Sequence, residues 1–168
     1  MGDQPNGDLP ATYTRRVEEA MDHRAVAVAT YNRCWDLLES PTRTPDEDAD
    51  LLTSAFTSRH HWQVVGGAPQ AITADWMISR SACELGLADL AVEYAERAFA
   101  GVQSGEHPAW LRASVFEGLG RAHAVAGNQE LRDRYVSLAW LILDREPDPD
   151  NREVIAAQLR SVPVGLVG

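Results

Sequence analysis

Hydrophobic residues recur every three or four positions along most of this chain, the spacing that gathers them on one face of an α-helix. No segment shows the apolar–polar alternation of a half-buried β-strand. Prolines and glycines separate the periodic segments. The pattern predicts seven helices, at residues 12–39, 46–64, 69–85, 88–103, 108–126, 128–145 and 149–161, the first with a candidate break at Asp22–His23.

Short turns at Gly86 and at Gly127–Asn128 each join two of these helices, which must therefore run antiparallel as helical hairpins. We predict an all-α fold with a single domain at 12–161, between an N-terminal tail at 1–11 and a C-terminal tail at 162–168. The domain divides into three hairpins and a capping helix, at 12–64, 69–103, 108–145 and 149–161.

The two later hairpins are similar in sequence. DWMISRSACELGLADLAVEYAERA aligns with FEGLGRAHAVAGNQELRDRYVSLA at an offset of 41 residues, placing Gly86 over Gly127 and Ser79 over Gly120. A small residue seven positions before the turn glycine and an alanine twelve positions after it resemble the tetratricopeptide repeat (TPR). The resemblance covers residues 75–139 by motif, and 12–64 only by helix layout.

The resemblance implies a TPR-like right-handed solenoid of stacked antiparallel hairpins, in which the first helix of each pair lines a concave face. Three features depart from the family pattern. The repeat is longer than the usual length of about 34 residues, and the closing proline is missing. Arg132 also occupies the position that Ala91 fills in the first copy.

Several polar residues interrupt the apolar stripes of the remaining helices. On helical wheels, Asn32, Asp36, Arg59, Asp75, Ser79, Arg112 and His123 fall in or beside these stripes, and Arg80 flanks the stripe of Trp76. An unpaired buried charge costs several kcal/mol, so each charged member needs a partner, water or a ligand.

Two interpretations follow. Arg59 pairs with Asp75 or Asp36 and fixes how the first two hairpins dock, or the polar residues line a pocket that three tryptophans enclose. Two arginines would favour a carboxylate, phosphate or sulfate as ligand. The predicted ligand-binding residues are Asn32, Trp35, Arg59, Trp62, Trp76, Ser79, Arg80 and Arg112.

The stretch TSRHHW, at 57–62, combines an arginine, two histidines and a tryptophan near the end of a predicted helix. The wheel places Arg59 and Trp62 inward, His60 beside them and His61 on the opposite side. Neighbouring histidines diverge on a helix, and the sequence has no histidine pair four residues apart and no Cys-x-x-Cys. We therefore expect no metal and no cofactor.

Charge and composition exclude several functions. Net charge is −10, which argues against nucleic acid as a partner. All 15 basic residues are arginine, so lysine chemistry such as a Schiff base is absent. No apolar run approaches the ~20 residues of a membrane span, and MGDQPNGDLP lacks the features of a signal peptide. We expect a cytoplasmic protein with Cys34 and Cys83 as buried free thiols, a disulfide between them being the alternative.

Three functions compete. The favoured prediction is a TPR-like binding or scaffold protein whose concave groove takes a partner protein, a peptide or an anionic ligand, with Arg59, Arg80, Arg112 and Arg121 available to anchor a carboxylate. The alternative is a small cofactor-independent enzyme acting on an anionic metabolite, with Asp75, Asp36, His60 and His123 as acid–base candidates. The third is a structural subunit that forms a homodimer through apolar surface such as SVPVGLVG.

Overall fold

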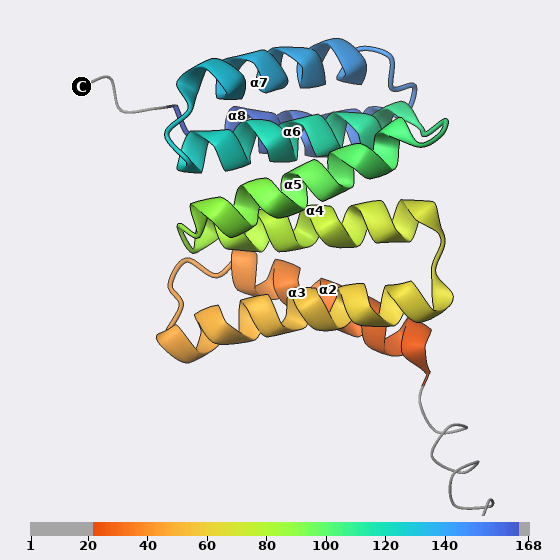
Figure 1. Cartoon of the computed structure of the whole chain (residues 1–168), viewed down its shortest axis with the longest axis vertical. Coiled ribbons are helices and arrows are strands. Elements are labelled where there is room, and N and C mark those ends of the chain that lie inside the picture. Colours follow the sequence, from red (N-terminus) through yellow and green to blue (C-terminus); the bar gives the residue numbers. More distant parts are fainter. Residues whose placement is uncertain (1–21, 165–168) are drawn as a thin grey trace, which may run out of the picture.

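Most of the helices begin at a capping side chain or a proline. The computed structural model describes residues 22–164, and within that range it contains seven helices and no strand (Figure 1): α2 (His23–Leu38), α3 (Pro45–Val65), α4 (Ala68–Glu84), α5 (Ala88–Gln103), α6 (Ala109–Val125), α7 (Gln129–Leu143) and α8 (Pro149–Arg160). The predicted all-α fold is confirmed, and the six later helices match their predicted ends to within two residues. Residues 12–21 of the first predicted helix lie outside the described range.

Side-chain caps explain several of these starts. Asp22 accepts a hydrogen bond from the backbone N–H of Ala25 and so begins α2 at the candidate break. Thr44 and Glu47 form a reciprocal capping box at the start of α3, with Pro45 in the first turn. Acidic residues follow in that turn, where the helix dipole favours negative charge.

The two later hairpins repeat the same backbone device. Gly86 and Gly127 have φ values of +69° and +75°, a conformation that glycine adopts without the steric penalty of a Cβ. At each turn the next residue closes a hydrogen bond back into the helix, from Leu87 N–H to Ala82 O and from Asn128 N–H to His123 O. The two turns that the sequence aligned are therefore equivalent in structure.

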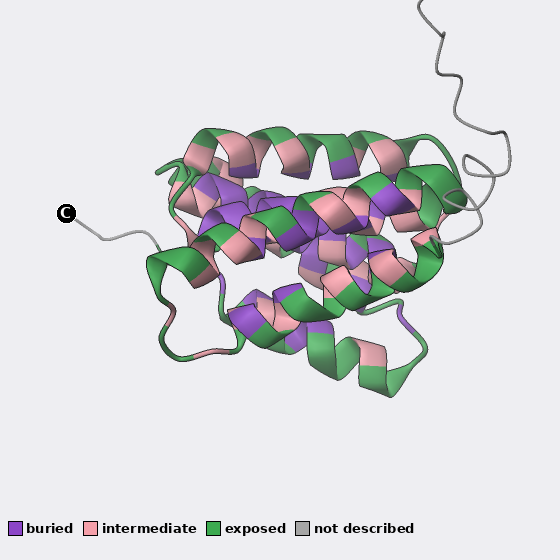
Figure 2. Ribbon diagram, turned by 90° about the horizontal axis from the view of Figure 1, so that it is seen from below, coloured by how far each residue is buried: buried purple, intermediate pink, exposed green. Residues whose placement is uncertain are grey.

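The helices form two layers. Each hairpin packs internally, as α2 with α3, α4 with α5, and α6 with α7, and α8 packs on both α6 and α7. The first helices also contact one another in the series α2, α4, α6 and α8, and Figure 1 shows α2 lying behind α3 and α8 behind α6. Buried residues lie on the sides of the helices that face one another, as the purple segments of Figure 2 show. Among the largest fully buried side chains are Leu51, Met77, Ile78, Leu111 and Leu119.

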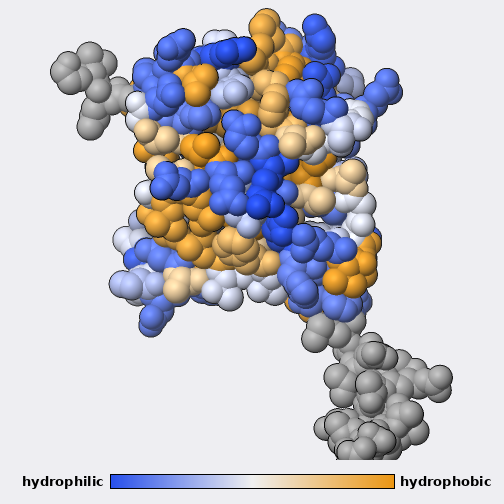
Figure 3. Space-filling model, viewed as in Figure 1, coloured by the Kyte–Doolittle hydropathy of each residue, from blue (hydrophilic) through white to orange (hydrophobic). Residues whose placement is uncertain are grey.

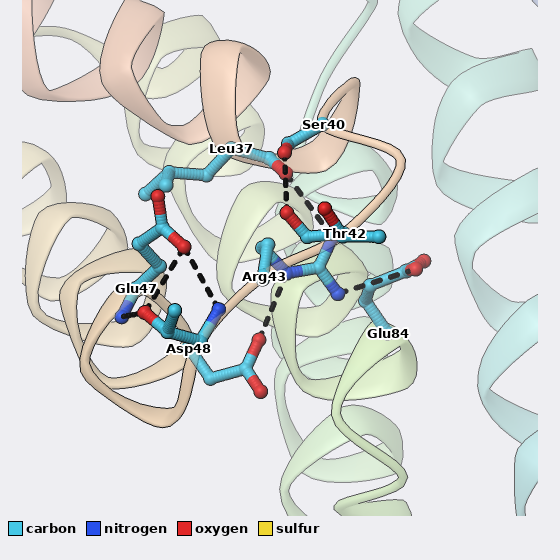
Figure 4. A network of polar contacts seen from close by, with 8 residues as sticks. Leu37, Ser40, Thr42, Arg43, Glu47, Asp48 and Glu84 are labelled. Carbon is cyan, nitrogen blue, oxygen red and sulfur yellow. Dashed lines mark hydrogen bonds and ion pairs between the residues drawn. The ribbon is translucent and has the colours of Figure 1, made fainter.

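Arg43 holds the α2–α3 connection against the second hairpin (Figure 4). Its Nε donates to Asp48 at 2.8 Å, and its two terminal nitrogens reach the carbonyl of Leu37 at 3.1 Å and the carboxylate of Glu84 at 3.4 Å. Only 12% of the side chain is exposed. One guanidinium therefore joins the end of α2, the start of α3 and the end of α4.

The fold extends beyond the predicted domain end at residue 161. Val162, the first residue of the predicted C-terminal tail, is buried. Arg132 donates hydrogen bonds to the carbonyls of Val162 and Pro163. The arginine that departs from the repeat pattern thus holds the segment after α8.

The predicted orientations of α2 and α3 need correction. The buried face of α2 consists of Ala27, Cys34 and Leu37, so Asn32 and Asp36 are exposed. The buried face of α3 includes Ser54, Ser58 and His61, whereas Phe56 is exposed. The wheel placed His61 on the outer side, but His61 meets His23 and Ser58 donates to the carbonyl of Ala27, so both polar side chains are satisfied at the α2–α3 contact.

Candidate functional site

A hollow lies on the side formed by the first helices of the hairpins. It consists of two adjoining cavities of about 300 and 360 Å³, which share Tyr31, Thr73 and Trp110. We call their combined surface the aromatic groove; it is lined by Val28, Tyr31, Trp35, Trp62, Pro69, Gln70, Thr73, Trp76, Trp110, Leu111, Ser114, Asn151, Val154, Ile155 and Gln158. Most of these residues belong to α2, α4, α6 and α8, and Trp62 comes from α3.

The series of helix contacts shapes this groove. The α2–α4, α4–α6 and α6–α8 contacts make a row, and the backbones of α2 and α8 do not approach each other closely, although residues of both helices line the 300 Å³ cavity. An exposed valine lines each cavity: Val28 of α2 lines the 360 Å³ cavity and Val154 of α8 lines the 300 Å³ cavity, with 41% and 57% of their surface exposed. The opposite layer, seen in Figure 3, instead mixes hydrophilic and hydrophobic residues, with strongly hydrophilic ones across its centre.

The groove wall is rich in tryptophan. Four of the five tryptophans line it, and the rings of Trp35 and Trp76 lie 6.0 Å apart at a tilt of 37°. Trp35, Trp62 and Trp76, which the sequence analysis expects to enclose a polar pocket, all line this groove. Tyr31, Thr73 and Trp110 were missed, although Tyr31 and Thr73 each lie one turn from a predicted tryptophan on the same helix face.

Trp76 is held in place by α6. Its Nε1–H donates to Glu117 Oε2 at 3.3 Å. Its ring lies so close to Gly118 that a Cβ there would come within 2.8 Å of it. A glycine at this point of α6 therefore allows the indole to lie against the helix backbone.

The groove is uncharged. Among the described residues, every polar side chain that lines it is neutral: Gln70, Thr73, Ser114, Asn151 and Gln158. Such a lining can hydrogen-bond peptide groups while the rings take up apolar side chains. No carboxylate, imidazole or guanidinium group lines either cavity.

A buried ion pair lies directly behind Trp76. Glu117 is fully buried and Arg121 is 5% exposed, and the Arg121 Nε donates to Glu117 Oε1 at 2.7 Å. Arg121 also donates to the carbonyls of Gln158 and Ser161, so it joins α6 to the end of α8. The prediction named Arg121 only as a possible anchor and missed Glu117, because a carboxylate within an apolar pattern is normally read as exposed. The available signal was the opposite charge four residues away on the same helix.

Arg80 lies beside this pair without a hydrogen-bond partner in residues 22–164. Its Nε is buried and unbonded, although the side chain as a whole is only partly buried. Burial, followed by the positive charge of Arg121, lowers the pKa of Arg80. It is the one predicted binding arginine that is both sheltered and unpaired.

The other predicted binding arginines lie elsewhere. Arg59 forms an ion pair with Asp75, and its guanidinium lies 5.6 Å from the ring centre of Tyr94 on α5. This geometry matches the structural interpretation, in which the pair docks the first two hairpins. Arg112 is exposed and lines a separate, polar hollow with His107 and Phe116. The wheel placed Arg112 inward, but α6 buries its neighbours Leu111 and Ala113 instead.

Ser79 is a packing residue. It is fully buried, and its hydroxyl donates to the carbonyl of Ala91 at 2.8 Å. The counterpart of Ser79 in the other hairpin is Gly120, and the counterpart of Ala91 is Arg132. A Cβ atom added to Gly120 would lie 3.5 Å from the carbonyl oxygen of Arg132. Small residues at this repeat position therefore allow the two helices of each hairpin to approach closely.

The predicted acid–base candidates do not come together. Asp75 is engaged by Arg59, whereas Asp36 and His60 are exposed. His123 is buried, its ring stacks on Tyr135 at 5.5 Å, and burial lowers its pKa. None of these four residues lines the aromatic groove.

The histidine arrangement differs from the wheel. His61, expected on the outer side of α3, is buried and meets His23 of α2 with 2.7 Å between their Nδ1 atoms. Burial, together with His23 and His60, lowers the pKa of His61. Within residues 22–164, no three histidine, cysteine or acidic side chains lie together in a way that could hold a metal ion.

The cysteines behave as buried thiols. Both are free and buried, as predicted, so the alternative of a disulfide between them is wrong. Burial raises the pKa of Cys34 and of Cys83 to about 12, which keeps both thiols protonated and unreactive at neutral pH.

The comparisons leave the family open. No protein-family model, no curated protein and no solved structure matches the chain. In the described part of the chain, no helix is long and apolar enough to cross a membrane.

Proposed function

We propose that this protein is a TPR-like binding module whose aromatic groove holds an apolar segment of a partner polypeptide. The observation that carries the proposal is the pair of adjoining cavities, which share Tyr31, Thr73 and Trp110 and have an uncharged lining that includes one tyrosine and four tryptophans. Two adjoining cavities suit two bulky side chains of one chain, and the neutral polar groups between the rings suit its peptide bonds.

Charge supports a polypeptide over a nucleic acid. The net charge of −10 would repel a phosphate backbone, and the groove offers no cation along its lining. An exposed valine in each cavity adds to the apolar surface that a partner would cover. The TPR-like assignment rests on the repeated turn glycines and on the small residues at 79 and 120.

The test is a selection from a displayed library of random peptides. We expect the wild-type protein to enrich peptides with two bulky apolar residues close together. Val154→Glu places a charge at the groove and should lower the affinity for these peptides by about tenfold or more. The bound peptide would cover the new carboxylate, which has no partner there. Leu141→Glu is the matched control, since Leu141 is 62% exposed on α7, away from the groove.

Two results would contradict the proposal. One is that Val154→Glu and Leu141→Glu weaken the binding of the enriched peptides equally, which would place the binding surface elsewhere. The other is the absence of any enriched apolar pattern.

A further inference from the structure

Three charged groups lie together behind the aromatic groove, and their charges do not cancel. Arg80 from α4 and Arg121 from α6 are positive, and Glu117 from α6 is the one buried carboxylate beside them. The cluster therefore carries one excess positive charge in a sheltered position. An uncompensated charge of this kind is costly unless water or an anion reaches it.

Glu117 has no free capacity for Arg80. One carboxylate oxygen accepts from Arg121 at 2.7 Å and the other accepts from the Trp76 indole at 3.3 Å. Glu84 also acts on Arg80 electrostatically, but it is 38% exposed and bonded to Arg43. No carboxylate in the described part of the chain is thus hydrogen-bonded to Arg80.

Arg80 follows the groove residues of α4 by one helical turn but lines neither cavity itself. Residues 73, 76 and 80 share one face of α4, and the first two line the 300 Å³ cavity. Two residues that line this cavity also bond the cluster. The Trp76 indole donates to Glu117, and the carbonyl of Gln158 accepts from Arg121. A ligand in the cavity would have Arg80 one helical turn beyond Trp76.

We propose that Arg80 is a subsite for a single carboxylate carried by the segment that occupies the aromatic groove. One excess positive charge matches a monoanion, and the free guanidinium edge can donate to a carboxylate oxygen. This inference rests on the proposed function and adds a specificity to it. The preferred segment combines bulky apolar groups with one acidic group beside them.

A pair of small probes tests the charge separately from the groove. Indole-3-propionate and its neutral amide have the same aromatic body, and calorimetric titration measures the binding of each. We expect the wild type to bind the carboxylate about tenfold more tightly than the amide, the effect of one charge-assisted hydrogen bond. In Arg80→Met the two probes should bind alike, with the affinity for the amide unchanged.

Control variants separate a local effect from net charge and folding. Arg112→Met removes the same charge from an exposed position and should keep the carboxylate preference. Arg80→Gln, which keeps a hydrogen-bonding group, replaces Arg80→Met if that variant does not fold, and should also lose the preference.

Two failures are distinguishable. Equal binding of both probes to the wild type, or a preference that survives in Arg80→Met, would overturn the Arg80 subsite and leave the groove in place. If neither probe binds the wild type, the groove does not take aromatic bodies, and the proposed function and the subsite are both overturned.

Discussion

At the scale of single residues, the arginines of this lysine-free chain have distinct roles. Arg43 and Arg121 each bond several backbone or carboxylate oxygens, and Arg59 pairs with Asp75 against Tyr94. The planar guanidinium, with five donors, suits such multiple contacts better than an ammonium group. Arg80 is the exception, because its sheltered Nε lacks a partner within residues 22–164.

The Glu117–Arg121 pair yields a stability prediction. Arg121→Met leaves a fully buried carboxylate without its ion partner and frees the carbonyls at the end of α8. We expect a loss of about 3–5 kcal/mol in the free energy of unfolding, measured by urea denaturation. Arg33→Met is the control, because Arg33 and Asp50 are both more than 40% exposed and their pair should contribute less than about 1 kcal/mol. Similar losses in the two variants would show that burial does not set the strength of these pairs.

At the scale of elements, equivalent turns and small residues organise the hairpins. Gly86 and Gly127 end α4 and α6 in the left-handed conformation, and each allows the next helix to fold back at once. Ser79 and Gly120 then permit close contact within each pair. The two hairpins can differ elsewhere, as they do at Arg132, because that side chain turns to the segment after α8.

Gly127→Ala tests the turn. No atom would meet the added Cβ, so the effect comes from the backbone, where φ of +75° is strained for alanine. We expect a loss of about 1–2 kcal/mol in thermal or urea unfolding. Gly105→Ala adds the same methyl group to a loop glycine that lacks a positive φ, and should change stability by less than about 1 kcal/mol. An equal effect at both positions would mean that the left-handed conformation is not needed.

At the scale of the whole molecule, stability should depend on pH through histidines buried between helices. His61 faces His23 of α2 and lies beside His60. His123 lies against Tyr135 of α7 and interacts electrostatically with Glu96 of α5. Burial lowers the pKa of both His61 and His123 below the ordinary value of 6.5. In mildly acidic solution these two histidines are therefore more protonated in the unfolded chain than in the folded protein.

Stability should consequently fall as pH drops below about 6.5, and the loss should stop growing once pH passes below the folded-state pKa values. Melting temperatures at a series of pH values from neutral to mildly acidic would measure this. The double variant His61→Gln, His123→Gln should flatten the profile, whereas His107→Gln, in the loop before α6, should leave it unchanged. A wild-type melting temperature that is constant over this range would contradict the prediction.

The sequence alone was sufficient for the helices, because their determinants are local. The three-to-four-residue periodicity, the capping Thr44 and Asn128, and the turn glycines act within a few residues of one another. They predicted the ends of α3 to α8 closely. The same local pattern identified three of the four tryptophans of the groove.

Only the tertiary structure decided which face of each helix is buried and which charges are paired. The wheel assumes one inward face, but α2 and α4 also present apolar residues to the groove, and α3 buries small polar residues against α2. Contacts such as Arg59 with Asp75, His23 with His61, and Arg121 with the end of α8 join distant parts of the chain. Which partner compensates a buried charge depends on the helices that pack around it, and that information is absent from periodicity along one helix.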